Sequence, residues 1–299
     1  MPLYFHIPMS EIAVSIIVPT YNSEKFIRRL LDGLFAYKGY VPFEVIIADG
    51  MSKDKTIKIC REYPVSIYNN PKVDAAAARN IGIKHAQGDI CAFIDSDCIP
   101  CENWVQKVYE AFDTPDIVAI GGKMLQHTPT NRVEAFSGRV FLQEHMKFPD
   151  QIIHVSGNKV AGAFLTANSA YKKSLLEHIG GLDERYSNYG EDIDLFWRAV
   201  NSRYGDMVFH PEITVEHSFP TTIRKMRKKF EQYGIADSRL NAAYSKKKVN
   251  FNPFYYKQFL YKLITLPFHP VDNFLYLLYI PAHIQGKIKG ARQCGIINF

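Results

Sequence analysis

The chain has few of the features that mark secreted, fibrous or disordered proteins. Its 299 residues include five cysteines, too few for a disulfide framework in a chain of this length. Residues 1–11 contain no basic segment followed by a long apolar one, so no secretory signal is expected. There is no internal repeat or low-complexity tract, and a composition of 47% hydrophobic and 22% charged residues excludes disorder throughout. The few cysteines and the N-terminus predict a cytoplasmic protein, and the length of 299 residues predicts one large domain, or one domain and an appendage.

The sequence also lacks an uninterrupted apolar run of the roughly 18 residues that a membrane-spanning helix needs. The segment Phe251–Ile284 is dense in Phe, Tyr and Leu, but prolines break it and Lys257, Lys262, His269 and Asp272 interrupt it. Such a lysine-edged, aromatic segment is typical of peripheral contact with a membrane interface, here expected at the cytoplasmic face. The alternative is that it packs on the protein itself or on a second subunit of an oligomer.

Acidic residues are fewer than basic ones, at 30 Asp and Glu against 36 Lys and Arg, for a formal net charge of +6. Much of the excess falls after about Thr221. A basic C-terminal third suggests an anionic partner such as diphosphate, an acidic membrane surface or nucleic acid, although a solvated basic surface is an alternative. Nucleic acid is the least favoured partner, because no recognition motif accompanies these residues.

Apolar strands and amphipathic helices alternate through the first hundred residues. The expected order is strand Val14–Val18, helix Glu24–Phe35, strand 43–50, helix Lys53–Glu62, strand 65–70, helix Ala75–His85 and strand 89–97. This alternation predicts an α/β fold with a mostly parallel sheet that helices cover on both faces. Ligands of such sheets bind at the carboxyl ends of the strands, where residues 20–22, 49–52 and 95–97 fall.

The second half of the chain is less regular. Residues His127–Val160 show no clear period and are expected to form a variable excursion. A strand and a helix ended by Gly180 and Gly181 are expected in 161–184, a helix in 192–200 and a strand pair in 207–217. We expect one α/β domain over residues 1–220 and a basic, aromatic-rich helical appendage over 221–299.

Two overlapping metal motifs stand in FIDSDCIPCENW. Asp95 and Asp97, at the end of an apolar strand, can share a small hard cation that also binds water and substrate phosphates, although such pairs also occur in solvated loops. Cys98 and Cys101 have the C-x-x-C spacing of a zinc or redox site. Because no second C-x-x-C or His pair accompanies them, the thiols are interpreted as filling a loop.

Further polar groups suited to a nucleotide follow the other strands. Tyr21 can stack on a base, and Asp49 can accept a hydrogen bond from a base N–H. No Gly-x-Gly-x-x-Gly follows the first strand, which disfavours a dinucleotide site. Asp192 lies just before a helix, where the helix dipole favours an ionised carboxylate suited to a general base. Alternatively, Asp192 or Asp194 merely caps that helix.

These motifs occur in an order that resembles the family 2 glycosyltransferases with the GT-A fold. The matching runs span roughly Ala13–His217 and are VSIIVPTYNSEKFIRRLLDGL, EVIIADGMSKDKT, AAARNIGIKHAQGDICAFIDSDCIPCENW, ANSAYKKSLLEHIGGLDE and YGEDIDLFWR. The resemblance implies a Rossmann-like sheet and metal-dependent, inverting transfer of a sugar from a nucleoside-diphosphate sugar. The acceptor would be a hydroxyl of a lipid-linked glycan or a cell-surface polysaccharide.

The resemblance also implies a role for each matching residue. The donor nucleotide would be held by Pro19, Tyr21, Glu24, Asp49, Arg79 and Asp95, and Mg2+ or Mn2+ by Asp97 and His217. Asp192 would be the catalytic base, with Asn168 and Glu191 as acceptor contacts or supports. Arg224 and Arg227 would contact the diphosphate, although the Gln-x-x-Arg-Trp of the family's basic loop does not occur here.

Three alternatives remain open. A retaining glycosyltransferase of the same fold would differ in the anomer that it forms. A sugar-nucleotide nucleotidyltransferase usually has a glycine-rich, basic N-terminal loop, which PTYNSEKF is not. A noncatalytic sugar-nucleotide or membrane-binding scaffold is disfavoured by the intact acidic motifs, because decayed enzymes often lose such carboxylates.

Overall fold

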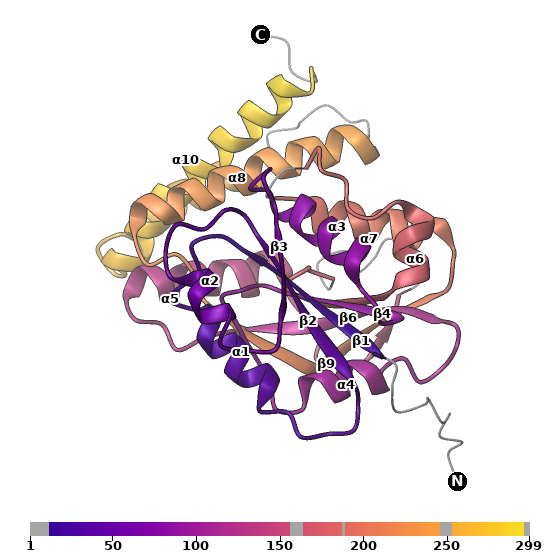
Figure 1. Ribbon diagram of the computed structural model, residues 1–299. Coiled ribbons are helices and arrows are strands. Elements are labelled where there is room, and N and C mark those ends of the chain that lie inside the picture. The colour runs from indigo at the N-terminus through magenta and orange to yellow at the C-terminus, as the bar shows by residue number, and fades with distance from the viewer. Residues whose placement is uncertain (1–11, 156–163, 187–188, 246–252, 296–299) are drawn as a thin grey trace. The chain divides into compact units, whose positions relative to one another are not determined.

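The computed structural model describes residues 12–155, 164–186, 189–245 and 253–295, which fall into two compact units (Figure 1). The first, here called the sheet unit, comprises Met1–Leu125, Met146–Ser187 and Glu191–His217. The second, the helical unit, comprises Gln126–His145, Asn188–Gly190 and Ser218–Phe299. The helical unit therefore draws on residues before and after 220, and a boundary between independent domains at that residue stays a prediction.

The sheet unit is built on a nine-stranded sheet of order β3-β2-β1-β4-β8-β6-β9-β5, in which β7 also pairs with β9. The strands are β1 Val14–Thr20, β2 Phe43–Asp49, β3 Ser66–Asn69, β4 Ile90–Ile94, β5 Cys98–Pro100, β6 Ile117–Gln126, β7 Ile153–His154, β8 Asn168–Lys172 and β9 Asp206–His217. The four strands β3, β2, β1 and β4 run parallel, as the alternating pattern predicts. From β8 onward the described pairings are antiparallel.

Helices cover both faces of this sheet (Figure 1). They are α1 Ile27–Phe35, α2 Thr56–Cys60, α3 Ala75–His85, α4 Trp104–Glu110, α6 Lys173–Ile179 and α7 Glu191–Ser202. Helices α3, α6 and α7 pack on one face around a core that includes Phe93, Tyr171 and Phe196, whereas α1 and α4 lie on the other. Asp74 caps α3 by accepting a hydrogen bond from the backbone N–H of Ala77 at 2.9 Å. As expected, α6 ends at Gly180, whose φ of +79° suits glycine.

The helical unit is formed by α5 Arg132–Arg139, η1 Val140–Met146, α8 Ile223–Leu240, η3 Asn241–Ser245, α9 Pro253–Ile264 and α10 Pro270–Gln293. Its core combines Phe136, Met226, Phe230, Tyr276 and Tyr279 from three helices. Helices α8 and α10 approach closely at a glycine: a Cβ on Gly290 would lie 2.6 Å from the carbonyl oxygen of Ile235. None of the helices in the described ranges combines the length and the apolarity that crossing a membrane requires.

One expectation about these segments is corrected for the residues described, since 156–160 lie outside them. The stretch His127–Val160 was expected to be an irregular excursion, but it contains α5 and the π-helix η1, both of which contribute to the core of the helical unit. The prolines that interrupt the apolar segment Phe251–Ile284 do not all end a helix, since α10 runs through Pro281. Pro281 is exposed, so its ring and its missing N–H are on the solvent side of the helix.

Candidate donor, metal and catalytic site

The carboxyl ends of β1, β2 and β4 meet at one edge of the sheet, and the loops that follow them are joined by side-chain hydrogen bonds. Asp49 is buried and accepts hydrogen bonds from Thr20 Oγ1 at 2.9 Å, Ser52 Oγ at 2.6 Å and Ser52 N at 2.8 Å. Ser23 Oγ lies 2.8 Å from Ser96 Oγ, which ties the loop after β1 to the turn after β4. Residues 20–22, 49–52 and 95–97, expected at this edge, therefore lie together, and we call them the rim; the hydroxyl groups of Thr20, Ser23, Ser52 and Ser96 join these loops.

Within this rim, the predicted base-binding residues differ in exposure. The ring of Tyr21 is exposed and available for stacking, whereas Asp49 is already bound on both oxygens by the protein. Glu24 accepts a hydrogen bond from Lys55 N at 3.1 Å, and Pro19 is paired with Ala48 in the sheet. Their contacts with a donor nucleotide stay predictions.

Three of the six described non-glycine residues with positive φ lie in the loops that follow β1, β2 and β3. Asn22, Met51 and Val73, which follow β1, β2 and β3, have φ values of +49°, +63° and +51°. Asparagine tolerates this left-handed region, but a β-branched valine adopts it rarely. Strained residues of this kind concentrate at ligand-binding sites, so the strain supports a binding role for the rim.

A buried cluster centred on Arg79 joins the rim to α7. Arg79 Nη2 lies 2.7 Å from Asp95 Oδ1, and Arg79 Nη1 lies 3.0 Å from Glu191 Oε1. The guanidinium, expected near the ribose or diphosphate, is thus taken up by two carboxylates. Arg79 therefore positions Asp95 and Glu191 relative to each other, and its direct contact with a donor stays a prediction.

Burial changes the proton affinity of the two acids at the start of α7. It raises the pKa of Glu191 to about 8, with the neighbouring charge of Asp192 acting in the same direction and that of Arg79 against it. Burial also raises the pKa of Asp192, while the hydrogen bond from Ile193 N at 2.8 Å and the charge of Arg79 lower it. A carboxylate with raised proton affinity is a better proton acceptor.

The same region offers an unused acceptor. Among the described residues, Glu191 Oε2 is buried without a hydrogen-bond partner. Buried polar atoms without partners are rare and point to a ligand or water. Asp194, the other acid considered as a cap of this helix, is paired with Arg198 Nε at 2.7 Å within α7.

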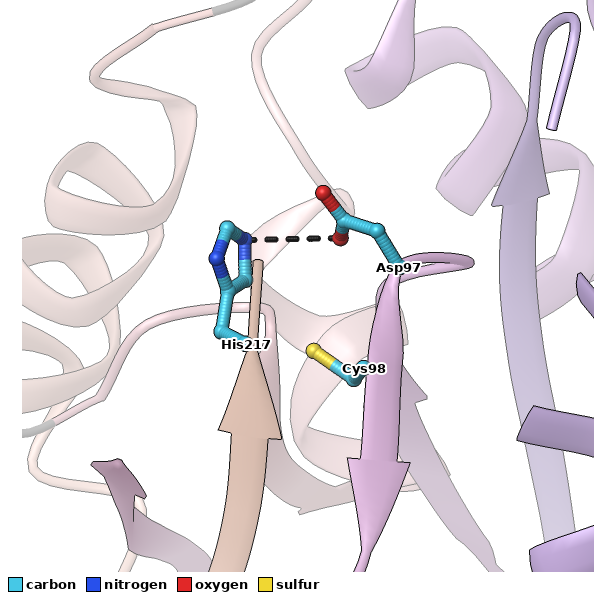
Figure 2. A group of neighbouring side chains, drawn as sticks. All are labelled: Asp97, Cys98 and His217. Carbon is cyan, nitrogen blue, oxygen red and sulfur yellow. Dashed lines mark ion pairs between the residues drawn. The ribbon is translucent and has the colours of Figure 1, made fainter. Parts of the chain in front are cut away.

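A second cluster lies where β5 pairs with β9. Cys98 is paired with His217 in the antiparallel register, and Asp97 directly precedes Cys98 in the chain. Figure 2 shows Asp97 and His217 directed toward each other, with His217 Nε2 3.4 Å from Asp97 Oδ1. Ligand atoms of Asp97, Cys98 and His217 all lie within 4.8 Å of one another, so these three residues can hold a metal ion.

The two carboxylates of Asp95-Ser96-Asp97 therefore face different partners, one in each cluster. Oxygen and imidazole nitrogen donors fit Mn2+, and the carboxylate alone fits Mg2+. The thiols were interpreted as loop filling, and each contacts a backbone carbonyl: Cys98 Sγ lies 3.7 Å from Ala167 O and Cys101 Sγ lies 3.8 Å from Glu212 O. Of the two, only Cys98 also lies beside Asp97 and His217. The nearness of Cys98 to the cluster follows from its register opposite His217, which spacing along the chain does not reveal.

Asn168 is buried at the first position of β8, and the protein uses both ends of its amide. Its Oδ1 accepts a hydrogen bond from Trp104 Nε1 at 3.0 Å, and its Nδ2 donates to the carbonyls of Lys123 at 3.0 Å and Ile213 at 2.8 Å. These contacts favour the supporting role over acceptor contact. Arg224 and Arg227 are exposed on the first turns of α8 in the helical unit, and their contact with a diphosphate stays a prediction.

Comparison with known proteins identifies the class to which this fold and rim belong. A sequence model described as "Glycosyl transferase family 2" matches residues 15–180, more than half of the chain. The chain therefore belongs to glycosyltransferase family 2.

Its similarity to particular proteins is more distant. It is 27% identical over 245 residues to chondroitin synthase of Pasteurella multocida (strain Pm70), covering 68% of this chain and 25% of the relative. It is 26% identical over 210 residues to glycosyltransferase AglE of Haloferax volcanii, covering 67% of this chain and 65% of AglE. The chain thus spans less than two thirds of the length of either relative.

Solved structures share the fold. Staphylococcus aureus TarS 1–349 in complex with UDP aligns over 94% of this chain and 91% of that chain, with a TM-score of 0.55 and 16% identity. The mannosyltransferase PcManGT of Pyrobaculum calidifontis, in complex with GDP-Man and Mn2+, aligns over 96% of this chain and 76% of that chain, with a TM-score of 0.56 and 18% identity. The predicted GT-A-type fold is confirmed.

Proposed function

We propose that this chain catalyses metal-dependent, inverting transfer of a sugar from a nucleoside-diphosphate sugar to a hydroxyl of a lipid-linked glycan or a cell-surface polysaccharide. The observation that carries the proposal is the Arg79 bridge. It places Asp95, at the donor rim, and Glu191, beside the candidate base Asp192, on one buried guanidinium. This bridge supports a proton acceptor at Asp192 next to the edge where the donor would bind.

The donor half of the proposal draws on the rim and the relatives. An exposed Tyr21 ring beside hydrogen-bonded loops offers a stacking surface for a base. TarS and PcManGT have been solved with UDP and with GDP-Man, respectively. We infer a nucleoside-diphosphate sugar on this basis, with no preference between the two bases.

The cation would be held by Asp97 and His217, with Cys98 beside them. A bound Mg2+ or Mn2+ supplies Lewis-acid stabilisation of the negative charge that develops on the leaving diphosphate. The carboxylate and imidazole are suited to Mn2+, which is also the ion present with PcManGT.

The proton would pass to Asp192. As the acceptor oxygen forms its bond to the anomeric carbon, the bond from that carbon to the diphosphate oxygen breaks, and Asp192 takes the hydroxyl proton. Attack opposite the leaving group in a single displacement inverts the anomeric configuration. Glu191 and Arg79 orient the start of α7 and do not exchange the transferred proton.

The acceptor and the location are inferred from relatives and composition. Curated relatives include a chondroitin synthase, a poly(ribitol-phosphate) β-N-acetylglucosaminyltransferase and an enzyme that acts on a dolichyl phosphate sugar. These names favour a polymer or a lipid-linked acceptor. We place the enzyme at the cytoplasmic face of a membrane, with peripheral contact through the region after residue 220.

The test replaces the base. In Asp192→Asn, transfer should fall by on the order of 10²-fold to 10⁴-fold, the usual contribution of a general base. The donor should still raise the melting temperature with Mn2+, because the rim and Asp97 are unchanged. Asp113→Asn, an exposed carboxylate-to-amide change in the same unit, is the matched control and should keep full activity.

Four outcomes would contradict the proposal, and each concerns a different part of it. Full transfer by Asp192→Asn would remove Asp192 as the base. Retention of configuration, read from the product anomer by proton NMR, would contradict single displacement. Release of pyrophosphate from a nucleoside triphosphate would indicate a nucleotidyltransferase. Donor stabilisation without turnover in the unmodified protein would indicate a binding scaffold.

A further inference from the structure

The hairpin of α9 and α10 carries a concentration of exposed apolar side chains. Seven of the sixteen large exposed hydrophobic residues among the described positions fall within residues 260–274. We call this set the apolar tip; it comprises Leu260, Tyr261, Leu263, Ile264, Phe268, Val271 and Phe274. Ile264 and Phe268 are the most exposed, at 72% and 78%. A concentration of exposed apolar side chains of this kind marks an interaction site.

The turn that presents the tip is fixed by its own hydrogen bonds. Thr265 Oγ1 donates to Tyr261 O at 2.8 Å and accepts from Asn273 Nδ2 at 2.9 Å. Asn273 is buried, and Phe268 N donates to Thr265 O at 3.1 Å. The turn is therefore held from both helices. Its apolar side chains are presented to solvent by a preorganised backbone, which lowers the entropic cost of binding.

One face of α10 beyond its first turn is buried in the protein and is not part of the tip. Leu275, Tyr276, Tyr279 and Ile280 are buried in the core of the helical unit. The expectation that Phe251–Ile284 lies in a membrane interface therefore does not apply to the buried face of α10. That face packs on the protein itself, which was the alternative expectation. What remains for a partner is the exposed surface of α9, the turn and the first turn of α10.

The charge of the surrounding region indicates the chemistry of that partner. Residues 221–299 contain fourteen Lys and Arg against three Asp and Glu. Within the tip region, Lys257 is exposed, the Lys262 ammonium lies 4.0 Å from the centre of the Tyr276 ring, and Asp272 is neutralised by Arg139 at 2.6 Å. A second copy of the chain would bring the same positive charge to the contact. An anionic surface that also accepts apolar side chains is a bilayer containing acidic lipids.

We propose that the apolar tip docks this protein on anionic membranes by shallow insertion, with Lys257 and Lys262 at the level of the headgroups. Aromatic and aliphatic side chains enter the boundary between headgroups and acyl chains, and the lysines interact with lipid phosphates. This proposal narrows the peripheral membrane contact proposed above to the apolar tip. Membrane docking by the tip does not depend on sugar transfer.

The test measures partitioning onto vesicles of phosphatidylcholine with about 30% phosphatidylglycerol, an acidic surface. The double variant Ile264→Ser and Phe268→Ser removes the two most exposed side chains and should lower the partition coefficient on the order of tenfold or more, because both would leave the acyl boundary. The matched control is Tyr40→Ser with Ile152→Ser, at 60% and 54% exposure in the sheet unit. It should bind like the unmodified protein.

Two further arms separate the contributions and the alternatives. Vesicles of phosphatidylcholine alone, or about 0.5 M salt, should weaken binding of the unmodified protein, because salt screens the lysine contribution. Equal binding by the tip variant and the control variant would overturn the proposal. So would a dimer that the tip variant converts to monomer in the absence of vesicles, since the patch would then be a subunit interface.

Failure here is distinguishable from failure of the proposed enzymatic function. Hydrolysis of a soluble donor with Mn2+ is measured on the same variants without lipid. The tip variant should keep the rate of the unmodified protein. Loss of vesicle binding with unchanged donor hydrolysis supports docking by the tip. Absence of hydrolysis in every variant, the unmodified protein included, would contradict the catalytic proposal and would not affect the conclusion from vesicle binding.

Discussion

Replacing Arg79 with alanine should destabilise the sheet unit far more than the removal of an ordinary surface arginine. The side chain of Arg79 is 4% exposed and bridges Asp95 and Glu191 at 2.7 and 3.0 Å. Removing it leaves two acids without their cation in a site from which water is largely excluded. Breaking a buried pair in this way costs about 3–5 kcal/mol.

The chain provides a matched control. Arg28 and Glu62 form a pair with the same 2.7 Å separation, but both side chains are 47% exposed. Pairs as exposed as this one contribute little to stability, because water and salt screen them. The two alanine variants therefore differ mainly in burial, and a difference of about 3 kcal/mol between them is expected.

The loss of stability expected for Arg79→Ala depends on pH, because Glu191 changes its protonation state. Its pKa is raised from an ordinary value of 4.5 to about 8, so its contribution to folding is fully present below about pH 4.5 and is lost as pH rises through 8. The charge of Arg79 lowers this pKa, so without Arg79 the ionised form of Glu191 would destabilise the folded state further. Arg79→Ala should therefore be more destabilising at pH 8 than at pH 5.

Urea unfolding followed by tryptophan fluorescence is the suitable assay, because both tryptophans, Trp104 and Trp197, belong to the sheet unit. Adding Glu191→Gln to Arg79→Ala should recover part of the loss, because the amide needs no cation. Equal unfolding free energies for Arg79→Ala and Arg28→Ala would refute the reasoning. So would a loss that does not change between pH 5 and pH 8.

Two further outcomes are expected elsewhere. Burial and the nearby His283 lower the pKa of His145 to about 4, so neutral His145 contributes stability above its ordinary value of 6.5 that is lost as pH falls toward 4, by up to ~3 kcal/mol. His145→Gln should flatten this dependence in urea unfolding followed by far-UV circular dichroism at pH 7 and 4.5; an unchanged slope would contradict it. Asn168→Asp exchanges two donated hydrogen bonds for repulsion against the carbonyls of Lys123 and Ile213, and should cost about 2–4 kcal/mol by tryptophan-detected unfolding. A loss below about 1 kcal/mol would show that the site relaxes.

The edge of the sheet that carries the site could be predicted because it depends on local patterns. Apolar strands alternating with amphipathic helices fix a parallel arrangement, and parallel strands end at the same edge. The polar residues after β1, β2 and β4 therefore had to lie together. The partner of each carboxylate was not predictable in this way, since the pairing of Asp95 with Arg79 depends on how α3 is oriented against β4.

Other features depended on long-range packing and were missed. Cys98 reaches the metal cluster through its register opposite His217, a residue more than a hundred positions away. The period of α5 and η1 is obscured because their buried residues face a core built largely from α8 and α10. Pro281 ends a helix by local rules, yet α10 continues because the residue is on the exposed side.

The Arg79 bridge also constrains how this site can diverge. One guanidinium serves an acid on the donor rim and an acid beside the base, so neither carboxylate can be exchanged for an apolar residue without leaving the arginine underpaired in the interior. Substitutions at 79, 95 and 191 should therefore occur together in related enzymes. A lineage that changes its donor by altering position 95 would be expected to rebuild the entrance of α7 as well.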